Sequence, residues 1–288
     1  MIIQENIPVG GKTTMRIGGA ARYYAELATK EDAEESLHFA VEKNLPLFVL
    51  GGGSNTIFAD GIINALVVRI KADAVTIDGN RVTVQGGKNL PMLINELAKK
   101  NLDLSPLTGI LGTVGGAIFG NAGQGPTGIW IDRYVESVTV LIDGTWKTLS
   151  QEECHFRYRE SFFKDFGKPV IIWETTLTVP SRPEVEAKAE IERLLQKRIE
   201  TQPHVKTAGS CFKAVGETPA WKLIDAAGLR GFKVGDVQIA EKHANFLLNV
   251  GKATFGDAKS IVEKVREKIP EQLEVEMRFV ENSGIIST

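Results

Sequence analysis

The residues best suited to chemistry begin with a glycine-rich loop at residues 107–125, which reads LTGILGTVGGAIFGNAGQG. The loop holds seven glycines and no charged side chain. Because glycine has no Cβ, such a loop brings backbone N–H groups close to a ligand. Oriented N–H dipoles can hold a diphosphate without a lysine. A buried structural loop could have the same composition, but a second glycine loop, GGGSN at residues 51–55, follows an apolar run. The pair of loops predicts a nucleotide site.

Neither loop has the spacing of a common nucleotide-binding motif. No Gly-Lys-Ser or Gly-Lys-Thr follows, as a P-loop requires, and neither loop reads GxGxxG at the start of a helix. A kinase-like NTPase and a Rossmann dehydrogenase are therefore disfavoured. The four histidines and two cysteines are scattered along the chain, so they predict neither a metal site nor a disulfide framework.

Two polar clusters could face such a site. Residues 156–163, FRYRESFF, place arginines beside aromatic rings, and arginine binds carboxylates bidentately. A basic surface patch covered by aromatic rings fits this spacing equally well. Residues 209–213, GSCFK, put a hydroxyl beside a lysine, and together with residues 274–278, EVEMR, they could form a catalytic corner.

Hydrophobic periodicity, helix caps and turn residues predict mixed elements along the chain. The expected helices cover residues 30–44, 91–100, 183–200, 219–227 and 254–268. The expected strands cover residues 22–27, 47–50, 66–70, 75–78, 81–85, 135–142, 145–149, 170–179, 246–250 and 273–280. Thr29, Thr218 and Thr254 are the expected N-caps, and Gly79-Asn80 and Asp143-Gly144 are the expected hairpin turns. On the helix at residues 183–200, Ile191, Leu195 and Ile199 form a stripe that we expect to face the core. Strand runs broken by single helices indicate an α+β fold.

The composition is that of an ordinary globular protein. The chain has 288 residues, of which 43% are hydrophobic and 24% charged. Its 34 lysines and arginines nearly balance 36 aspartates and glutamates, which gives no support for binding to nucleic acid or a membrane surface. The first residues lack the pattern of a signal peptide, and no apolar run is long enough to span a bilayer. We expect a soluble cytoplasmic protein.

Taken together, seven blocks of the chain resemble the UDP-N-acetylenolpyruvoylglucosamine reductases (MurB), flavoenzymes of peptidoglycan precursor synthesis. The blocks are TTMRIGGAARY, LGGGSN, TGILGTVGGAIFGNAG, FRYRESFF, GSCFK, GLRGFKVGDVQIAEKHANFLLN and EVEMR. They follow the order of the family at its usual intervals and cover nearly the whole chain.

The resemblance implies a two-lobed FAD-binding domain of the vanillyl-alcohol-oxidase (PCMH) type and a smaller α+β substrate-binding domain. It puts the FAD-binding region at about residues 1–200, with lobes at about 1–68 and 69–200, and the substrate domain at about 201–288. The last strand and tail are candidates to return to the FAD lobe. Because the chain has no long insert after GSCFK, it resembles the shorter type II form.

The activity implied by the resemblance is reduction of the enolpyruvyl ether of UDP-N-acetylglucosamine to UDP-N-acetylmuramate, with NADPH as reductant. FAD would be tightly but non-covalently bound, and NADPH would leave before the substrate enters. Arg159 would stabilise the developing enolate, Ser210 would protonate the α-carbon, and Glu276 would help to hold the enol form. Arg159 and Lys213 would also bind the substrate through its carboxylate or diphosphate.

The resemblance also assigns flavin contacts to both glycine loops. They are Gly52, Gly53, Ser54 and Asn55 in the first loop, and Gly112, Thr113, Val114, Gly115, Gly116, Asn121, Ala122 and Gly123 in the second.

The chain departs from the pattern of the family in two places. The usual FKNP is replaced by Lys213 followed by Ala214 and Val215, which removes an expected nucleotide contact. The usual PEVR appears as Val275, Glu276, Met277 and Arg278, which keeps the spacing of the charged pair. Because neither change removes a proposed catalytic group, we expect an active enzyme. We also expect the enzyme to be a monomer.

Two alternatives remain open at this point. One is another FAD oxidoreductase of the same fold; many of these tether the flavin through His or Cys, and neither glycine loop holds either residue. The other is a non-catalytic module that binds a UDP-sugar or FAD.

Overall fold

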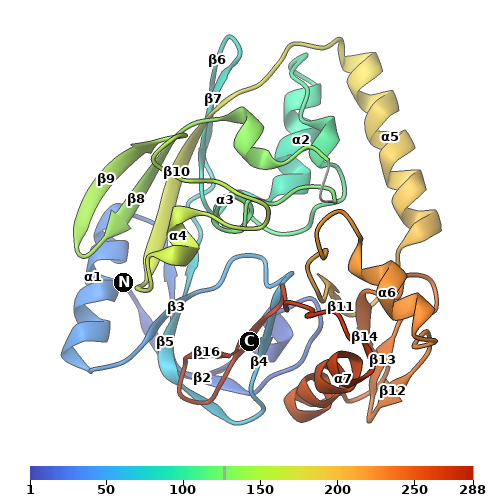
Figure 1. The fold of residues 1–288 in the computed structure, drawn as a ribbon. Coiled ribbons are helices and arrows are strands. Elements are labelled where there is room, and N and C mark those ends of the chain that lie inside the picture. Colours follow the sequence, from blue (N-terminus) through green and yellow to red (C-terminus); the bar gives the residue numbers. More distant parts are fainter. Residues whose placement is uncertain (126–127, 288) are drawn as a thin grey trace.

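The computed structural model describes residues 1–125 and 128–287, and Figure 1 shows how its elements are arranged. The chain begins with a four-stranded sheet in the order β1-β2-β5-β3. Its strands are β1 (Ile3–Pro8), β2 (Ala20–Leu27), β5 (Ile62–Ile70) and β3 (Leu47–Val49). Strands β2, β5 and β3 are parallel, and helix α1 (Lys30–Glu42) connects β2 to β3. The carboxyl end of β3 leads directly into the GGGSN loop.

A second sheet is fully antiparallel and has the order β6-β7-β10-β8-β9. Its strands are β6 (Val75–Asp78), β7 (Arg81–Gln85), β10 (Val170–Thr178), β8 (Val135–Ile142) and β9 (Thr145–Ser150). One hydrophobic core joins this sheet to helices α2 (Leu90–Ala98), α3 (Val114–Phe119) and α5 (Glu184–Thr201). Helix α3 therefore places the second glycine loop beside the sheet.

Four short helices among the described residues lie in the connections between the elements of these two sheets. They are 3-10 helices η1 (Gly10–Lys12), η2 (Ser105–Leu107) and η3 (Ile131–Tyr134), and helix α4 (Phe162–Asp165). Positive φ angles at Gly79, Asp143 and Gly144 close the two predicted hairpins, as a two-residue turn between antiparallel strands requires.

A third sheet, in the order β11-β14-β13-β12, forms the C-terminal part with two helices. The elements are β11 (Thr207–Ser210), β14 (Phe246–Asn249), β13 (Val237–Ile239), β12 (Lys233–Val234), α6 (Ala220–Ala226) and α7 (Phe255–Lys268). Its core also takes in Met15, Ile17 and Ile57 from the start of the chain. The first and last thirds of the sequence therefore share buried apolar surface.

The end of the chain runs beside the first glycine loop. Strand β15 (Arg278–Val280) pairs in parallel with β4 (Thr56–Phe58) and antiparallel with β16 (Ile286–Ser287). In addition, the backbone N–H of Arg278 donates to the carbonyl of Asn55 at 3.0 Å. This pairing carries the EVEMR segment to the GGGSN loop.

Most of the predicted local elements are confirmed, and the N-caps Thr29 and Thr254 are the clearest cases. Thr29 and Thr254 each accept from the backbone N–H of an aspartate three residues on, which returns a hydrogen bond to the cap. The prediction for Thr218 is wrong, because Pro219 is the N-cap of α6 and makes no side-chain capping bond.

Two further predictions are corrected by long-range contacts. The strand expected at residues 273–280 covers only Arg278–Val280, because the preceding residues pair irregularly with Cys211 and Phe212. The stripe on α5 is core only at Ile191; Leu195 and Ile199 are 40% and 48% exposed. The second half of α5 leaves the core and borders a cavity.

Over the described residues, no helix has the length and apolarity needed to cross a bilayer.

Replacing Thr254 by Ala tests the capping box of α7. The variant loses the acceptor for the Asp257 N–H while the buried face of the helix stays intact. We expect the free energy of unfolding, measured by urea denaturation, to fall by about 1 kcal/mol. Thr254→Ser keeps the acceptor and should retain most of the stability. Equal stability of Thr254→Ala and the unchanged protein would show that the cap contributes nothing.

Candidate active site

One continuous cavity of about 1750 Å³ runs between the three parts of the fold. Both glycine loops, the FRYRESFF segment, β11 and the EVEMR segment contribute residues to its wall. Ligand pockets for a single small molecule commonly have volumes of about 300–1,000 Å³. The cavity is therefore large enough for a dinucleotide cofactor and a second ligand together.

The GGGSN loop presents an unusual row of free backbone donors. Within the described residues, none of the backbone N–H groups from Gly51 to Asn55 donates a hydrogen bond. Unpaired N–H groups are costly unless water or a ligand accepts from them. Five such groups in succession on a cavity wall fit the oxygens of a diphosphate.

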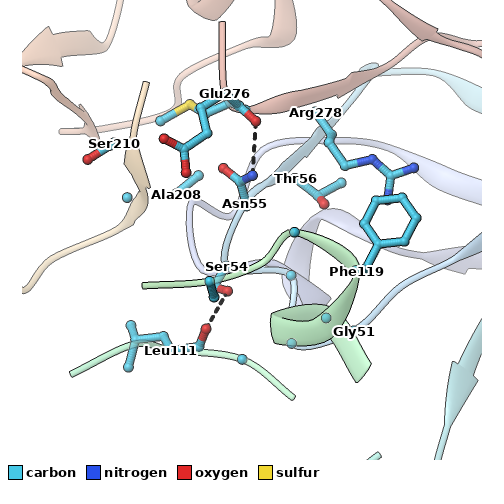
Figure 2. A pocket seen from close by; sticks show the side chains of 18 of the residues that line it. Gly51, Ser54, Asn55, Thr56, Leu111, Phe119, Ala208, Ser210, Glu276 and Arg278 are labelled. Atoms are coloured by element: carbon cyan, nitrogen blue, oxygen red, sulfur yellow. Dashed lines mark hydrogen bonds between the residues drawn. The ribbon is translucent and has the colours of Figure 1, made fainter. Parts of the chain in front are cut away.

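The two glycine loops fit closely against each other, as Figure 2 shows for Ser54 and Leu111. The Ser54 hydroxyl donates to the Leu111 carbonyl at 2.8 Å. A Cβ on Gly52 would lie 2.5 Å from the Cα of Gly112, and Gly53 has a φ of +67°. Glycine is required here because the backbones of the loops leave no room for side chains.

Most of the predicted flavin contacts lie on the cavity wall. They are Gly52, Gly53, Ser54, Asn55, Gly112, Thr113, Gly115, Gly116, Ala122 and Gly123. Val114 and Asn121 lie behind the wall and are fully buried. The Asn121 amide instead donates to the Arg157 carbonyl and accepts from the Asp132 N–H, so it supports the FRYRESFF turn.

Arg159, Ser210 and Glu276 come together on the cavity wall although they are distant in sequence. The Glu276 N–H donates to the Cys211 carbonyl at 2.8 Å, which places Glu276 beside the residue that follows Ser210. Figure 2 shows the Glu276 side chain pointing toward Ser210 and Ala208. Arg159 Nε lies 3.2 Å from Glu276 Oε1.

This contact leaves one hydrogen-bond donor unused. The Arg159 Nε–H does not point at the carboxylate, and among the described residues Nε has no hydrogen-bond partner although it is buried. A buried guanidinium donor without an acceptor is destabilising. The arrangement therefore suits a further anionic oxygen between Arg159 and Glu276.

The environment of Glu276 favours its protonated form. Burial raises the pKa of Glu276, and the nearby Arg159, Lys164 and Lys213 only partly offset that effect. A carboxyl with a raised pKa can donate a hydrogen bond at a pH where glutamate is ordinarily ionised.

Lys213 is held by two carboxylates and does not project freely into the cavity. Its ammonium contacts Glu160 and donates to Glu274 Oε1 at 2.5 Å. Burial lowers the pKa of Lys213, but the hydrogen bonds to both glutamates outweigh it, so the net shift is upward. Glu274 is 65% exposed, while the Lys213 side chain is only 9% exposed.

Lys164 supports the backbone of Arg159. Arg159 adopts a φ of +59°, a conformation that costs free energy in any residue with a side chain. The Lys164 ammonium donates to the Arg159 carbonyl at 2.6 Å and lies 3.7 Å from Glu160. Lys164 directly follows FRYRESFF, but no motif in the sequence marks it as a site residue.

The cavity is strongly electropositive overall. Among the described residues, ten lysines and arginines and three glutamates line it. Sequence reasoning also gave no role to Arg198, Arg278 or His243, which all lie on this wall. The balanced charge of the whole chain conceals this local excess.

Comparison with known proteins identifies the family. The profile described as FAD binding domain matches residues 21–150, and UDP-N-acetylenolpyruvoylglucosamine reductase, C-terminal domain, matches residues 202–280. The chain is 38% identical to a UDP-N-acetylenolpyruvoylglucosamine reductase from Moorella thermoacetica, over 96% of this chain and 91% of that protein. The chain belongs to the MurB family.

Further MurB relatives agree in sequence and in structure. A reductase from Aquifex aeolicus is 33% identical over 99% of this chain and 97% of its own length. The crystal structure of MurB from Thermus caldophilus superposes with a TM-score of 0.84, at 32% identity, over 96% of this chain and 99% of that one. These matches confirm the predicted α+β fold with its FAD-binding domain, and an FAD-dependent oxidoreductase of peptidoglycan precursor synthesis.

The residues that line the cavity fit the cofactor of the family. The unpaired amides of residues 51–55 suit the FAD diphosphate, and the glycines leave room for it to approach the backbone. Among the described residues no group of His, Cys, Asp and Glu side chains could hold a metal ion.

Replacing Gly52 by Ala tests whether the interlocked loops hold the flavin. The new methyl group would overlap Gly112, so the loops must separate and the row of N–H groups must move. We expect FAD affinity, measured by quenching of flavin fluorescence, to fall at least about tenfold. Gly256→Ala is the matched control, because the nearest atom to its Cβ, in helix α7, is 3.7 Å away. Unchanged FAD affinity in Gly52→Ala would exclude this role of the loop.

Proposed function

We propose that the chain reduces the enolpyruvyl ether of UDP-N-acetylglucosamine to UDP-N-acetylmuramate, with NADPH as the reductant. The observation that carries the proposal is the buried Arg159 Nε, which has no hydrogen-bond partner among the described residues and lies beside Glu276. An enolpyruvyl group has a carboxylate adjacent to the double bond that is reduced. Such a carboxylate supplies the acceptor that Arg159 lacks.

We assign one role in the reaction to each of the three side chains. Bound FAD supplies hydride transfer from NADPH to the terminal methylene carbon of the enolpyruvyl ether. We assign to Arg159 the stabilisation of the negative charge that develops on the carboxylate as an enolate forms. Ser210 donates a proton to the α-carbon, which completes the addition of two hydrogens to the double bond. Protonated Glu276 donates a hydrogen bond to the enol oxygen.

Serine is a weak acid, so its role depends on its neighbours. The enolate carbon is a strong base, and cations nearby lower the cost of forming a serine alkoxide. Arg159, Lys164 and Lys213 all lie close enough to Glu276 to affect its pKa, and Ser210 is in the same corner. This excess of positive charge supports Ser210 as the proton donor.

We also propose a division of binding between the parts of the chain. Residues 1–200 would hold FAD, and residues 201–288 would cover the substrate. Lys213 would release the exposed Glu274 and bind the diphosphate or carboxylate of the substrate in its place. We propose a monomeric cytoplasmic enzyme. Because the chain is nearly balanced in charge, we expect it to bind neither nucleic acid nor a membrane surface.

Replacing Ser210 by Ala should separate the two half-reactions. Reduction of FAD by NADPH, followed as loss of flavin absorption in anaerobic stopped flow, should proceed close to the unchanged rate. Reoxidation by the enolpyruvyl substrate should slow by at least about 100-fold, because the proton donor is gone. If both half-reactions kept their rates, Ser210 would not be the donor.

The raised pKa of Glu276 predicts a pH dependence of the second half-reaction. The protonated carboxyl is the hydrogen-bond donor, so the rate should be highest below the raised pKa and fall as pH rises through it. Glu276→Gln keeps a donor that does not titrate, so its rate should show no such fall. A rate that rises with pH in the unchanged protein, or the same fall in Glu276→Gln, would contradict this assignment.

Replacing Lys164 by Met removes the donor that holds the Arg159 carbonyl. We expect reoxidation by the substrate to slow by up to about 100-fold, since a small displacement of a positioned group has effects of that size. Lys164→Arg should recover part of the rate, and Lys188→Met, an exposed lysine paired with Glu184, should leave it unchanged. A purely structural role would lower the melting temperature of Lys164→Met without separating the two half-reactions.

A further inference from the structure

The TTMR segment at residues 13–16 joins the first glycine loop to the strand that carries Ser210. The Thr14 hydroxyl donates to the carbonyl of Thr207, the first residue of β11, at 2.6 Å. The Thr14 N–H donates to the Gly53 carbonyl at 3.1 Å. Thr14 and Thr207 are 193 positions apart in the sequence, and both lie on the cavity wall. One residue therefore links the proposed FAD loop to the strand of the proposed proton donor.

The hydroxyl proton of Thr14 goes to Thr207 and not to the first glycine loop. A hydroxyl donates one hydrogen bond, and O–H···O bonds normally measure about 2.5–3.0 Å between the oxygens. The other acceptor within reach, the Gly53 carbonyl, lies 3.3 Å from the Thr14 hydroxyl oxygen. Because the Thr14 backbone already bonds to Gly53, its side chain is available to β11.

The backbone around Thr14 has a fixed position. Met15 and Ile17 are buried in the core of the C-terminal part. The Asn249 amide donates to the Met15 carbonyl at 3.0 Å, which fastens the segment to the end of β14. A side chain on a backbone that is held on both sides can keep its partner within a fraction of an ångström.

Strand β11 depends on such a contact because its own sheet holds it loosely. Among the described residues β11 is an edge strand that pairs with β14 alone, and the register of that pair shifts between Thr207 and Ser210. Gly209, with a φ of +79°, interrupts the strand directly before Ser210. The Cys211 N–H donates to the Asn245 carbonyl at 2.8 Å and holds the chain after Ser210. Thr14 supplies the corresponding contact before it.

We propose that Thr14 is a positioning residue that sets the separation between the first glycine loop and the Ser210 hydroxyl. In the proposed reaction the hydride and the proton reach adjacent carbons of one double bond, so this separation must be fixed. Reduction of FAD by NADPH does not use Ser210 and does not depend on Thr14 in this way. The inference rests on the role of Ser210 in the proposed function.

The test compares Thr14→Val, which keeps the branched shape without the hydroxyl, with Thr14→Ser, which keeps the hydroxyl. FAD affinity, reduction by NADPH and reoxidation by the enolpyruvyl UDP-sugar are measured separately, the last in H2O and in D2O. Thr76→Val is the matched control, because Thr76 is exposed on the edge strand β6 and does not line the cavity.

Thr14→Val should keep the FAD affinity and the rate of reduction of the unchanged protein. Its reoxidation should slow by at least about tenfold, since a displaced proton donor loses rate steeply with distance. The solvent isotope effect on reoxidation should increase, because proton transfer becomes the slower step. Thr14→Ser should recover most of the rate, and Thr76→Val should leave it unchanged. Thr14→Ala takes the place of Thr14→Val if the latter does not fold.

A double variant shows whether Thr14 acts through Ser210. In Ser210→Ala the donor is already absent, so adding Thr14→Val should cause no further loss of rate. A further loss as large as in the unchanged protein would overturn the inference. Weaker FAD binding or equal slowing of both half-reactions in Thr14→Val would also overturn it, because Thr14 would then only support the fold. If the proposed function itself failed, the enolpyruvyl UDP-sugar would not reoxidise even the unchanged protein.

Discussion

The contact between Arg159 and Glu276 joins the FRYRESFF segment to the last segment of the chain, and the arrangement of the site depends on it. Two backbone contacts hold the glutamate in place. The Asn55 amide donates to the Glu276 carbonyl at 3.0 Å, and the Glu276 N–H donates to Cys211. The first glycine loop, the turn after β11 and the arginine are thereby brought to one point.

The cost of burying charge explains much of the surrounding structure. Lys164 supports the strained Arg159 backbone, Lys213 is neutralised by two glutamates, and Arg278 lies between two rings. Each of these contacts fixes a cation at a position with little access to water. Fixed charges stabilise a reacting anion more than mobile ones, since they need not reorganise during the reaction. We therefore expect these cations to favour the proposed reaction and to make the protein less stable when no ligand is bound.

Local features of the fold could be predicted from the sequence because their causes are local. The capping boxes at Thr29 and Thr254 and the hairpin at Asp143 and Gly144 depend on residues within a few positions. The irregular backbone of residues 273–277 could not, since its partners near Cys211 lie over 60 residues away. Asn121 likewise has a polar side chain that suggests a ligand, but its amide serves Arg157 and Asp132.

The same distinction holds for the site. Motifs in sequence identified Arg159, Ser210 and Glu276, and the structure brings them together. Lys164 becomes visible only through its contact with Arg159, because a lysine beside an aromatic residue is common on protein surfaces. The central claim is that the glycine loops hold FAD with its reactive ring at these three side chains. A crystal structure with FAD and the enolpyruvyl UDP-sugar tests it most directly. We predict the FAD diphosphate at the amides of residues 51–55 and the substrate carboxylate at Arg159, whereas either group bound elsewhere would contradict the claim.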